Sequence, residues 1–191
     1  MAVATILASP SDEELVTGAA AGDRAALEEL FRRYRQLAYR VAHRLLGNEA
    51  DALDAVQDGF VKALMHLAQF QGRSSFKTWL LRVVSNAALD LGRQRGRRES
   101  LALETLRLRS EQEPGPAPDH GLEREDLRRD LQAALDQLAP AQRQTFVLHA
   151  EAELSYREVA DAMGISIGTV MSRLFYARQR LRTLLEAWMK R

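Results

Sequence analysis

The chain has 191 residues, of which 46% are hydrophobic and 28% charged, and its formal net charge is +1. This length accommodates one or two small domains with hydrophobic cores, and the composition excludes collagen-like and wholly disordered proteins. The absence of cysteine excludes a disulfide framework, a thiol nucleophile and a cysteine-ligated zinc site. No stretch has the roughly 20 apolar residues of a membrane span, and the N-terminus lacks the basic start of a signal peptide. We therefore expect a cytoplasmic protein without membrane insertion.

The charges are unevenly distributed along the chain. Residues 67–98 contain seven basic residues and one acidic residue, and residues 163–191 contain six basic residues and one acidic residue. The remaining segments have an excess of acidic residues. Two separate cationic blocks favour two contacts with a polyanion such as nucleic acid. The alternative is ordinary solvated surface charge with a basic C-terminal tail.

The N-terminal part of the chain is predicted to be helical, because strand-like alternation is missing and apolar residues recur at helical spacing. Ser11 or Asp12 is placed to cap a first short helix. A second helix is predicted over residues 24–46, where apolar residues form one stripe. The pair Gly47 and Asn48 is typical of the end of such a helix.

Two further helices are predicted from about residue 50 to 69 and from about residue 76 to 93. The polar segment FQGRSS between them predicts a loop. The residues expected to point inward from the first of these helices are Val56, Phe60, Ala63, Leu64 and Leu67.

Residues 97–122 interrupt the helical pattern. The stretch EQEPGPAPDHG contains three prolines and two glycines among acidic residues, so it predicts a flexible linker. This linker divides the chain into an N-terminal domain over residues 11–96 and a C-terminal domain over residues 123–191. The predicted fold class is all-α, with two small helical domains, the second of which contains a helix-turn-helix.

The strongest local signal of the C-terminal domain is this helix-turn-helix. Ser155 and Glu158 form a capping box that begins a short helix. Gly164 occupies the position where that helix must end with a positive φ, and Ser166 then caps a second helix. The residues of the second helix that recur at inward-facing spacing are Val170, Leu174, Ala177 and Leu181.

The outer face of the second helix carries polar, basic and aromatic side chains, namely Thr169, Ser172, Arg173, Tyr176 and Arg180. Side chains of these types at the start of a helix reach base edges and phosphates in a DNA major groove. The alternative is a helical hairpin whose outer face is merely solvated. The capping box, the turn glycine and the basic helix together favour DNA binding.

The N-terminal basic block has a different character. Asn86, Asp90 and Arg93 share one helix edge, and Phe76 and Trp79 stand at the helix start. Aromatic and amide side chains beside a cationic track suit single-stranded or splayed bases. An equally good interpretation places both aromatic rings in the core and lets Asn86 and Asp90 bond neighbouring backbone groups.

Three segments in order resemble the extracytoplasmic-function, or group 4, sigma factors of bacterial RNA polymerase. ADALDAVQDGFVKAL resembles region 2.2, and FQGRSSFKTWLLRVVSNAALDLGRQR resembles regions 2.3 and 2.4. LAPAQRQTFVLHAEAELSYREVADAMGISIGTVMSRLFYARQRLR resembles regions 4.1 and 4.2. The resemblance implies a factor that binds core polymerase and directs promoter-specific initiation by recognising the −35 duplex and by melting and capturing the −10 element.

The resemblance also implies roles for particular residues. Those assigned to the −10 element are Gln71, Gly72, Arg73, Ser74, Ser75, Lys77, Arg82, Asn86, Arg93 and Arg95. Those assigned to the −35 duplex are the outer-face residues of the second helix of the helix-turn-helix, Thr169, Ser172, Arg173, Tyr176 and Arg180. Those assigned to the clamp helices of the largest polymerase subunit are Asp54, Gln57, Asp58 and Val61. Helical spacing also places Asp54, Asp58 and Val61 on one face, for which a solvated surface is an equal alternative.

The resemblance also implies binding partners, and the sequence leaves one main alternative function. The resemblance implies promoter DNA, core polymerase and an anti-sigma factor as partners, with no cofactor, metal or catalytic residue. An enzyme is disfavoured because the four histidines lack metal-ligand spacing, and no phosphate-binding loop or serine nucleophile motif is present. The main alternative is a stand-alone helix-turn-helix repressor or activator, which would bind duplex DNA tightly without polymerase.

Overall fold

The fold is taken from a computed structural model, which describes residues 9–107 and 123–189. Within these ranges every regular element is helical, which confirms the predicted all-α fold. The N-terminal unit consists of α1 (Asp12–Ala20), α2 (Arg24–Leu46), α3 (Glu49–His66), the 3-10 turn η1 (Leu67–Gln69) and α4 (Phe76–Arg107). The C-terminal unit consists of α5 (Glu123–Asp136), α6 (Pro140–Ala150), α7 (Tyr156–Met163) and α8 (Ile167–Met189). None of the helices in these ranges is long and apolar enough to span a membrane.

Capping residues fix the helix boundaries of the N-terminal unit. Ser11 rather than Asp12 caps α1: its Oγ accepts from the Glu14 backbone N–H at 3.2 Å, and the Glu14 carboxylate accepts from the Ser11 N–H at 2.7 Å. Asn48 caps α3, since its side-chain oxygen accepts from the Asp51 N–H at 2.9 Å. Gly47 ends α2 with a φ of 76°, as its sequence position predicts.

Two expectations for the N-terminal unit are wrong in detail. Helix α4 continues to Arg107 instead of ending near Arg93. Good helix formers continue through this stretch, and the next proline along the chain stands only at position 114. Residues 108–122 of the predicted linker lie outside the described residues. Leu64 was expected to point inward but is 50% exposed, because it lies at the edge of the α3 stripe that no helix of the described chain covers.

The helix-turn-helix of the C-terminal unit follows the prediction closely. The Glu158 N–H donates to Ser155 Oγ at 3.3 Å, and the Ser155 N–H donates to the Glu158 carboxylate at 2.8 Å. Gly164 has a φ of 64°, and Ser166 Oγ accepts from the Thr169 N–H at 3.1 Å to cap α8. All four predicted inward residues of α8 are buried: Val170, Leu174, Ala177 and Leu181.

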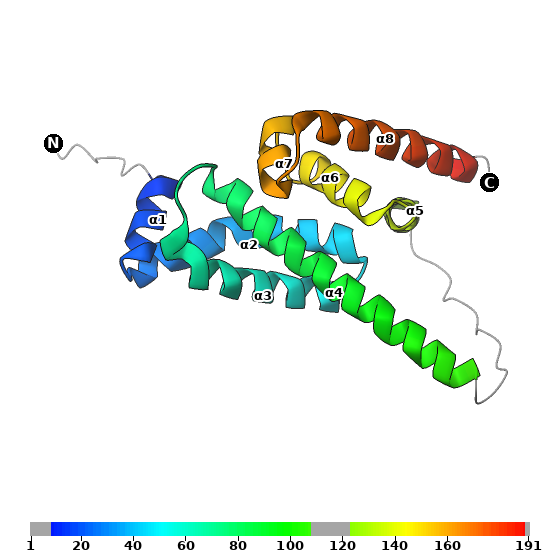
Figure 1. Ribbon diagram of the computed structural model, residues 1–191, viewed down its shortest axis with the longest axis horizontal. Helices are drawn as coiled ribbons and strands as arrows, with labels where there is room; N and C mark the ends of the chain where they lie inside the picture. The colour runs from blue at the N-terminus through cyan, green and yellow to red at the C-terminus, as the bar shows by residue number, and fades with distance from the viewer. Residues whose placement is uncertain (1–8, 108–122, 190–191) are drawn as a thin grey trace.

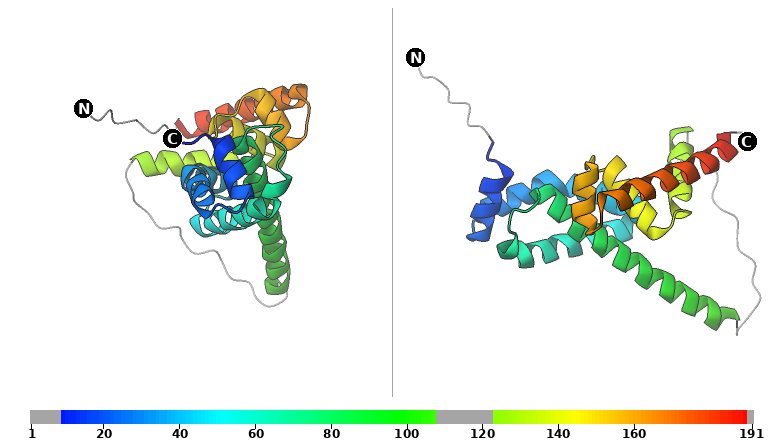
Figure 2. Two further views of the ribbon diagram at one scale, coloured as in Figure 1. Left: turned by 90° about the vertical axis from the view of Figure 1, so that its left-hand side faces the viewer. Right: turned by 45° about the horizontal axis from the view of Figure 1, so that its top comes forward.

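The two units pack against each other and share one hydrophobic core. In Figures 1 and 2, α6 and α7 lie on the side of the N-terminal unit formed by α2 and α4; α6 contacts both of these helices, and α7 contacts α4. One buried cluster extends from Leu80 and Val84 of the N-terminal unit to Leu148 and Val159 of the C-terminal unit. A smaller cluster joins α5 to α8 through Ala134, Leu135, Leu138, Ala177 and Leu181. Beyond this contact the later part of α4 extends away from the other helices, as Figure 1 shows.

The closest approach of α3 and α4 depends on Gly59. A Cβ added at this position would lie 2.8 Å from Val84 Cγ2 and 3.0 Å from Val84 Cα, so any side chain must push the two helices apart. We predict that Gly59→Ala lowers the free energy of unfolding by about 1–3 kcal/mol, in spite of the better helix propensity of alanine. Urea denaturation measures this change.

The matched control is Gly96→Ala in α4, where an added Cβ meets no atom within 4 Å. This variant is expected to be neutral or more stable by up to about 1 kcal/mol. Equal losses of stability in the two variants would contradict the role given to Gly59.

A second prediction concerns acid stability at the helix-turn-helix. Hydrogen bonds from the side chain and backbone of Ser155 lower the pKa of Glu158 below its ordinary value. A carboxylate with a lowered pKa in the folded state stabilises the fold above its unfolded pKa and loses that contribution as the pH falls through the folded pKa. The stability advantage of the wild-type chain over Glu158→Gln is therefore expected at neutral pH and should shrink as the pH falls below about 4. Thermal denaturation across this pH range measures it, and a constant advantage would contradict the account.

Candidate nucleic-acid interface

The loop of residues 71–75 lies between η1 and α4 and presents polar groups to solvent. Gln71, Gly72 and Arg73 are exposed, and Gly72 has a φ of 65° with no atom within 4 Å of an added Cβ. Ser75 caps α4, since its Oγ accepts from the Thr78 N–H at 3.1 Å. The loop is therefore fixed at its C-terminal end and open on its outer side, which leaves room for a base or sugar to approach the backbone.

Aromatic residues stand on both sides of this loop and pack against one another. Phe76 is buried, and its ring centroid lies 6.1 Å from that of Phe70 and 5.8 Å from that of Trp79. Phe70 and Trp79 are half-buried and lie 5.2 Å apart. Of the two interpretations that the sequence left open, the core role holds for Phe76, which is not accessible for stacking on a base. The contact between Phe70 and Phe76 joins the two ends of the loop.

Asn86 lies on α4 at the contact between the two units. Its Oδ1 accepts a hydrogen bond of 3.2 Å from Nε2 of Gln144, and the same amide nitrogen lies 3.0 Å from Oγ of Ser85. Gln144 belongs to α6 and is only 7% exposed, whereas Asn86 is exposed. A residue predicted to bind the −10 element thus holds the C-terminal unit in this conformation.

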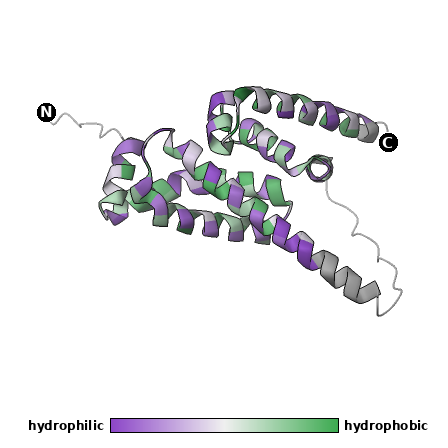
Figure 3. Cartoon of the chain, in the orientation of Figure 1, coloured by the Kyte–Doolittle hydropathy of each residue, from purple (hydrophilic) through white to green (hydrophobic). Residues whose placement is uncertain are grey.

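The basic residues assigned to the −10 strand follow α4 outward. Lys77 is half-buried near the start of the helix, and Arg82 is exposed. Further along, Arg93 pairs with Asp90 at 2.6 Å, and Arg95 pairs with Asp51 at 2.8 Å. Figure 3 shows hydrophilic colouring on the part of α4 that begins to project from the unit.

Solvent limits the strength of these pairs. Both arginines are more than half exposed, so each pair contributes at most about 1 kcal/mol and can be exchanged for a phosphate at little cost. Hydrogen bonds from Asn48 and then from Arg95 lower the pKa of Asp51, which therefore stays ionised near neutral pH.

The predicted −35 residues lie on the outer side of α8. Ser172, Tyr176 and Arg180 are exposed, and Thr169 and Arg173 are half-buried. The Ser172 hydroxyl donates to the Thr169 carbonyl at 3.0 Å, which leaves its lone pairs directed outward.

Sequence reasoning missed a second, apolar strip on α8. Ile167, Met171 and Phe175 are exposed by 42%, 54% and 63%. Their i, i+4, i+8 spacing is the signal that marks them, since Met171 and Phe175 each directly follow an inward residue, Val170 and Leu174. Apolar side chains in this position complement thymine methyl groups in a major groove.

The four residues assigned to polymerase docking are all exposed along α3: Asp54, Gln57, Asp58 and Val61. Asp58 forms a 2.7 Å ion pair with Lys62, one turn further on. An apolar groove of about 220 Å³ lies beside this face between α2 and α3. Exposed apolar side chains at its edge are Phe31, Val61 and Leu64. The sequence pointed to the acidic half of this face and to Val61, and it missed Phe31 and Leu64.

Further polar contacts close the interface between the units. Arg40 and Arg44 of α2 both face Glu151, at 2.8 Å and 3.5 Å. The Thr78 hydroxyl lies 3.4 Å from the Glu158 carboxylate, so the capping box of α7 also contacts the start of α4. The C-terminal unit therefore contacts the side of α4 that carries Thr78, Ser85 and Asn86.

Comparison with known proteins gives the family. The Sigma-70 region 2 model matches residues 30–98, and the Sigma-70 region 4 model matches residues 128–181. The ECF RNA polymerase sigma factor SigE of Mycolicibacterium smegmatis is 39% identical over 183 residues, covering 92% of this chain and 70% of that protein. The ECF RNA polymerase sigma-E factor of Escherichia coli is 30% identical over 177 residues, covering 90% of this chain and 92% of that protein.

Two solved structures have the same architecture. CnrH, in complex with the cytosolic domain of CnrY, matches with a TM-score of 0.72 and 28% identity over 93% of this chain and 99% of CnrH. The sigma factor RpoE of Bartonella quintana, in complex with the anti-sigma factor NepR, matches with a TM-score of 0.63 and 28% identity over 83% of this chain and 98% of RpoE. Together with the helical fold and the helix-turn-helix, these matches show that the chain belongs to the extracytoplasmic-function sigma factors, the alternative sigma factors that direct transcription initiation.

Proposed function

We propose that this factor reads a promoter with its two units at two separate elements while α3 holds core RNA polymerase. The observation that carries this proposal is the pair of exposed polar surfaces on different units, the loop of residues 71–75 and the outer side of α8. A stand-alone repressor would need only the second surface. Such a factor acts in the cytoplasm and has no catalytic chemistry of its own.

Capture of the −10 element is assigned to the loop of residues 71–75 and to α4. Unstacking a base costs a few kcal/mol per step, so the opened strand must gain contacts that the duplex lacks. The open backbone at Gly72 and the amides of Gln71 and Asn86 supply hydrogen bonds to an exposed base edge. Lys77, Arg82, Arg93 and Arg95 hold the strand phosphates, which makes binding fall with salt.

Recognition of the −35 duplex is assigned to the predicted outer residues of α8. Arg173 and Arg180 supply charge for guanine edges or phosphates, and Ser172 and Tyr176 supply hydroxyl groups. The apolar strip of Met171 and Phe175 adds contacts to thymine methyl groups. This mixture favours a site that contains both G·C and A·T pairs.

Docking on the clamp helices of the largest polymerase subunit is assigned to the exposed face of α3. Asp54 and Asp58 supply negative charge at one end, and Val61 and Leu64 supply apolar surface beside the groove. An apolar centre with a charged rim is the usual composition of a stable interface.

Use of the −10 surface requires the two units to separate. Asn86 bonds Gln144 in this conformation, and α7 covers the start of α4. The strand and the C-terminal unit therefore compete for one side of α4.

A partner that favours the closed arrangement would keep the factor inactive. The matched CnrH and RpoE structures are both complexes with another protein, and the partner of RpoE is an anti-sigma factor. We include an anti-sigma factor among the partners on this ground.

Run-off transcription tests the proposal most simply. Core polymerase is incubated with a library of genomic fragments with and without the protein, and transcript starts are mapped. Selected starts that share two spaced elements are expected only when the protein is present. Starts that share no element, or tight binding to duplex DNA with no binding to core polymerase, would contradict the proposal.

Asn86→Ala is expected to reduce open-complex formation roughly tenfold while leaving the affinity for core polymerase unchanged, because one hydrogen bond to a captured base is lost. Permanganate reactivity of unpaired thymines measures the opening. The matched control is Gln144→Met, which leaves Asn86 in place and removes the hydrogen bond from the other side, together with the bond from Gln144 to Ser85. The control is expected to open the promoter at least as well as wild type, and a similar loss in both variants would show that Asn86 acts only through the contact between the units.

Leu64→Glu is expected to weaken the affinity for core polymerase roughly tenfold, because it places a charge in the apolar half of the docking face. Met65→Glu is the control, since Met65 is a 73% exposed neighbour that does not line the groove. Fluorescence anisotropy of the labelled factor with core polymerase measures both affinities. Equal affinities for the two variants would remove the groove from the docking face.

A further inference from the structure

We propose that Tyr34 and Asp12 are positioning residues that hold the loop of residues 71–75 in its base-capturing shape. Neither residue lies in the loop, and neither is among those assigned to DNA. The inference rests on the proposed function, since it assumes that this loop binds a base of the −10 element. It adds a structural link from α1 through α2 to the loop.

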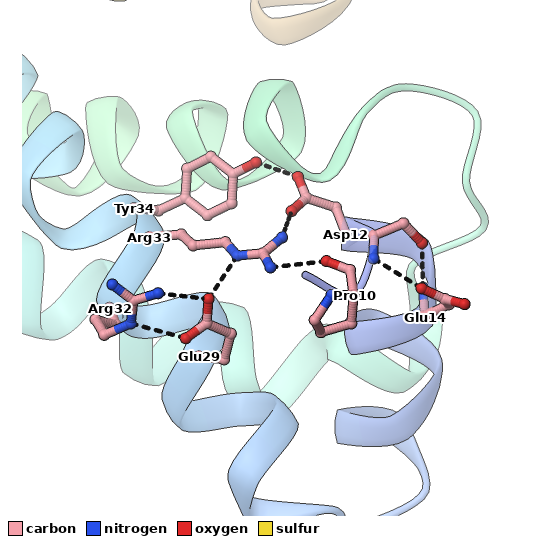
Figure 4. A network of polar contacts seen from close by, with 8 residues as sticks. Pro10, Asp12, Glu14, Glu29, Arg32, Arg33 and Tyr34 are labelled. Atoms are coloured by element: carbon pink, nitrogen blue, oxygen red, sulfur yellow. Dashed lines mark hydrogen bonds and ion pairs between the residues drawn. The ribbon is translucent and has the colours of Figure 1, made fainter. Parts of the chain in front are cut away.

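The link begins with a polar network between α1 and α2, which Figure 4 shows. The Tyr34 hydroxyl donates to one carboxylate oxygen of Asp12, and Arg33 Nη1 donates to the other at 3.0 Å. Arg33 also donates to the Pro10 carbonyl at 2.7 Å and to the Glu29 carboxylate at 2.8 Å. Asp12 is thereby held by two donors, and its position fixes the direction of the tyrosine side chain.

The tyrosine hydroxyl is a dependable donor. Burial, followed by the hydrogen bond to Asp12, raises the pKa of Tyr34 well above its ordinary value. The phenol therefore stays protonated throughout the physiological range, and the contact with the carboxylate persists.

The ring of Tyr34 packs against Phe76, the residue that follows the loop. Its centroid lies 5.5 Å from that of Phe76 in an edge-on arrangement. Phe76 is the first residue of α4, directly after the loop, and its ring also contacts Phe70, directly before the loop. The loop of residues 71–75 thus ends at Phe76, which packs against Tyr34, and begins after Phe70, which packs against Phe76. Helix α1 also contacts η1 and α4, which flank the loop.

A loop held at both ends has less conformational freedom to lose when it binds. Ordering a flexible loop on binding costs free energy, so a preorganised loop binds the same base more tightly. Gly72, which makes the loop open to a base, also makes it flexible, and the ring contact between Phe70 and Phe76 at its two ends offsets that freedom. Asp12 and Tyr34 are therefore expected to affect affinity only when a base enters the loop.

The test uses holoenzyme assembled from core polymerase and the full chain. The probe is the single-stranded −10 segment of a promoter selected in the run-off experiment, made intact and with one base at a time replaced by an abasic site. The variants are Tyr34→Phe, which removes only the hydroxyl, and Asp12→Ala. The matched control is Tyr39→Phe on the same helix, since Tyr39 is half-buried against His43 and its hydroxyl makes no hydrogen bond within the described ranges.

For wild-type holoenzyme, one abasic substitution should weaken binding strongly. Tyr34→Phe and Asp12→Ala are expected to weaken binding of the intact strand roughly fivefold to tenfold, the usual effect of one lost charge-assisted hydrogen bond. They should leave binding of that abasic strand unchanged, while Tyr39→Phe should match wild type on both. A general loss of folding would instead weaken both strands equally.

The outcomes separate the inference from the function on which it rests. If wild-type holoenzyme binds every abasic strand as well as the intact strand, base capture by the loop fails. If wild type distinguishes the strands and Tyr34→Phe distinguishes them equally well, capture stands and the positioning role is overturned. Equal weakening of intact and abasic strands by Tyr34→Phe also overturns it, because the residue then only stabilises the unit.

Discussion

The packing of α6 and α7 onto α2 and α4 is the constraint on which the rest of this conformation depends. Val147, Leu148 and Val159 bury their side chains in the same core as Leu80 and Val84. The Gln144 amide is buried in this contact and finds partners on α4. A buried amide without partners would cost about 1–3 kcal/mol, so these bonds favour one register of the two units over neighbouring ones.

Electrostatics act on the same contact and on the surfaces around it. Glu151 forms ion pairs with two arginines of α2. Glu158 lies beside Thr78, and its pKa is lowered mainly by the hydrogen bonds from Ser155 and to a smaller extent by the charge of Lys77. Acidic groups of the C-terminal unit therefore face basic and polar groups of α2 and α4. A nucleic-acid strand offers the same charge, and the net charge of +1 hides this arrangement because basic and acidic segments nearly cancel.

Local features of the fold could be predicted from the sequence, and features set by distant contacts could not. Ser155 with Glu158, Gly47 and Gly164 act within one turn of backbone, so their residue types determine the caps and helix ends. The outward position of Leu64 depends on which neighbouring helix covers α3, and the end of α4 depends on how far good helix formers continue. Helical periodicity alone contains neither kind of information.

The candidate sites divide in the same way. Exposure of the loop of residues 71–75 and of Ser172 and Tyr176 follows from spacing and turn chemistry. The bond between Asn86 and Gln144 joins residues 58 positions apart, and the link from Asp12 to the loop crosses three elements. Such contacts arise only from packing, which is why the sequence indicated candidate residues for DNA contact but not the residues that hold them in place.

The central claim is that the units are closed in the free chain and separate when the promoter strand occupies α4. The chain has no cysteine, so spin labels on cysteines introduced at the exposed positions Gln36 of α2 and Asp161 of α7 report the distance between the units without background. Pulsed electron paramagnetic resonance of the free protein should give one short distance. In the open complex with core polymerase and promoter DNA, that distance should be replaced by a longer one. An unchanged short distance in the open complex would contradict the account.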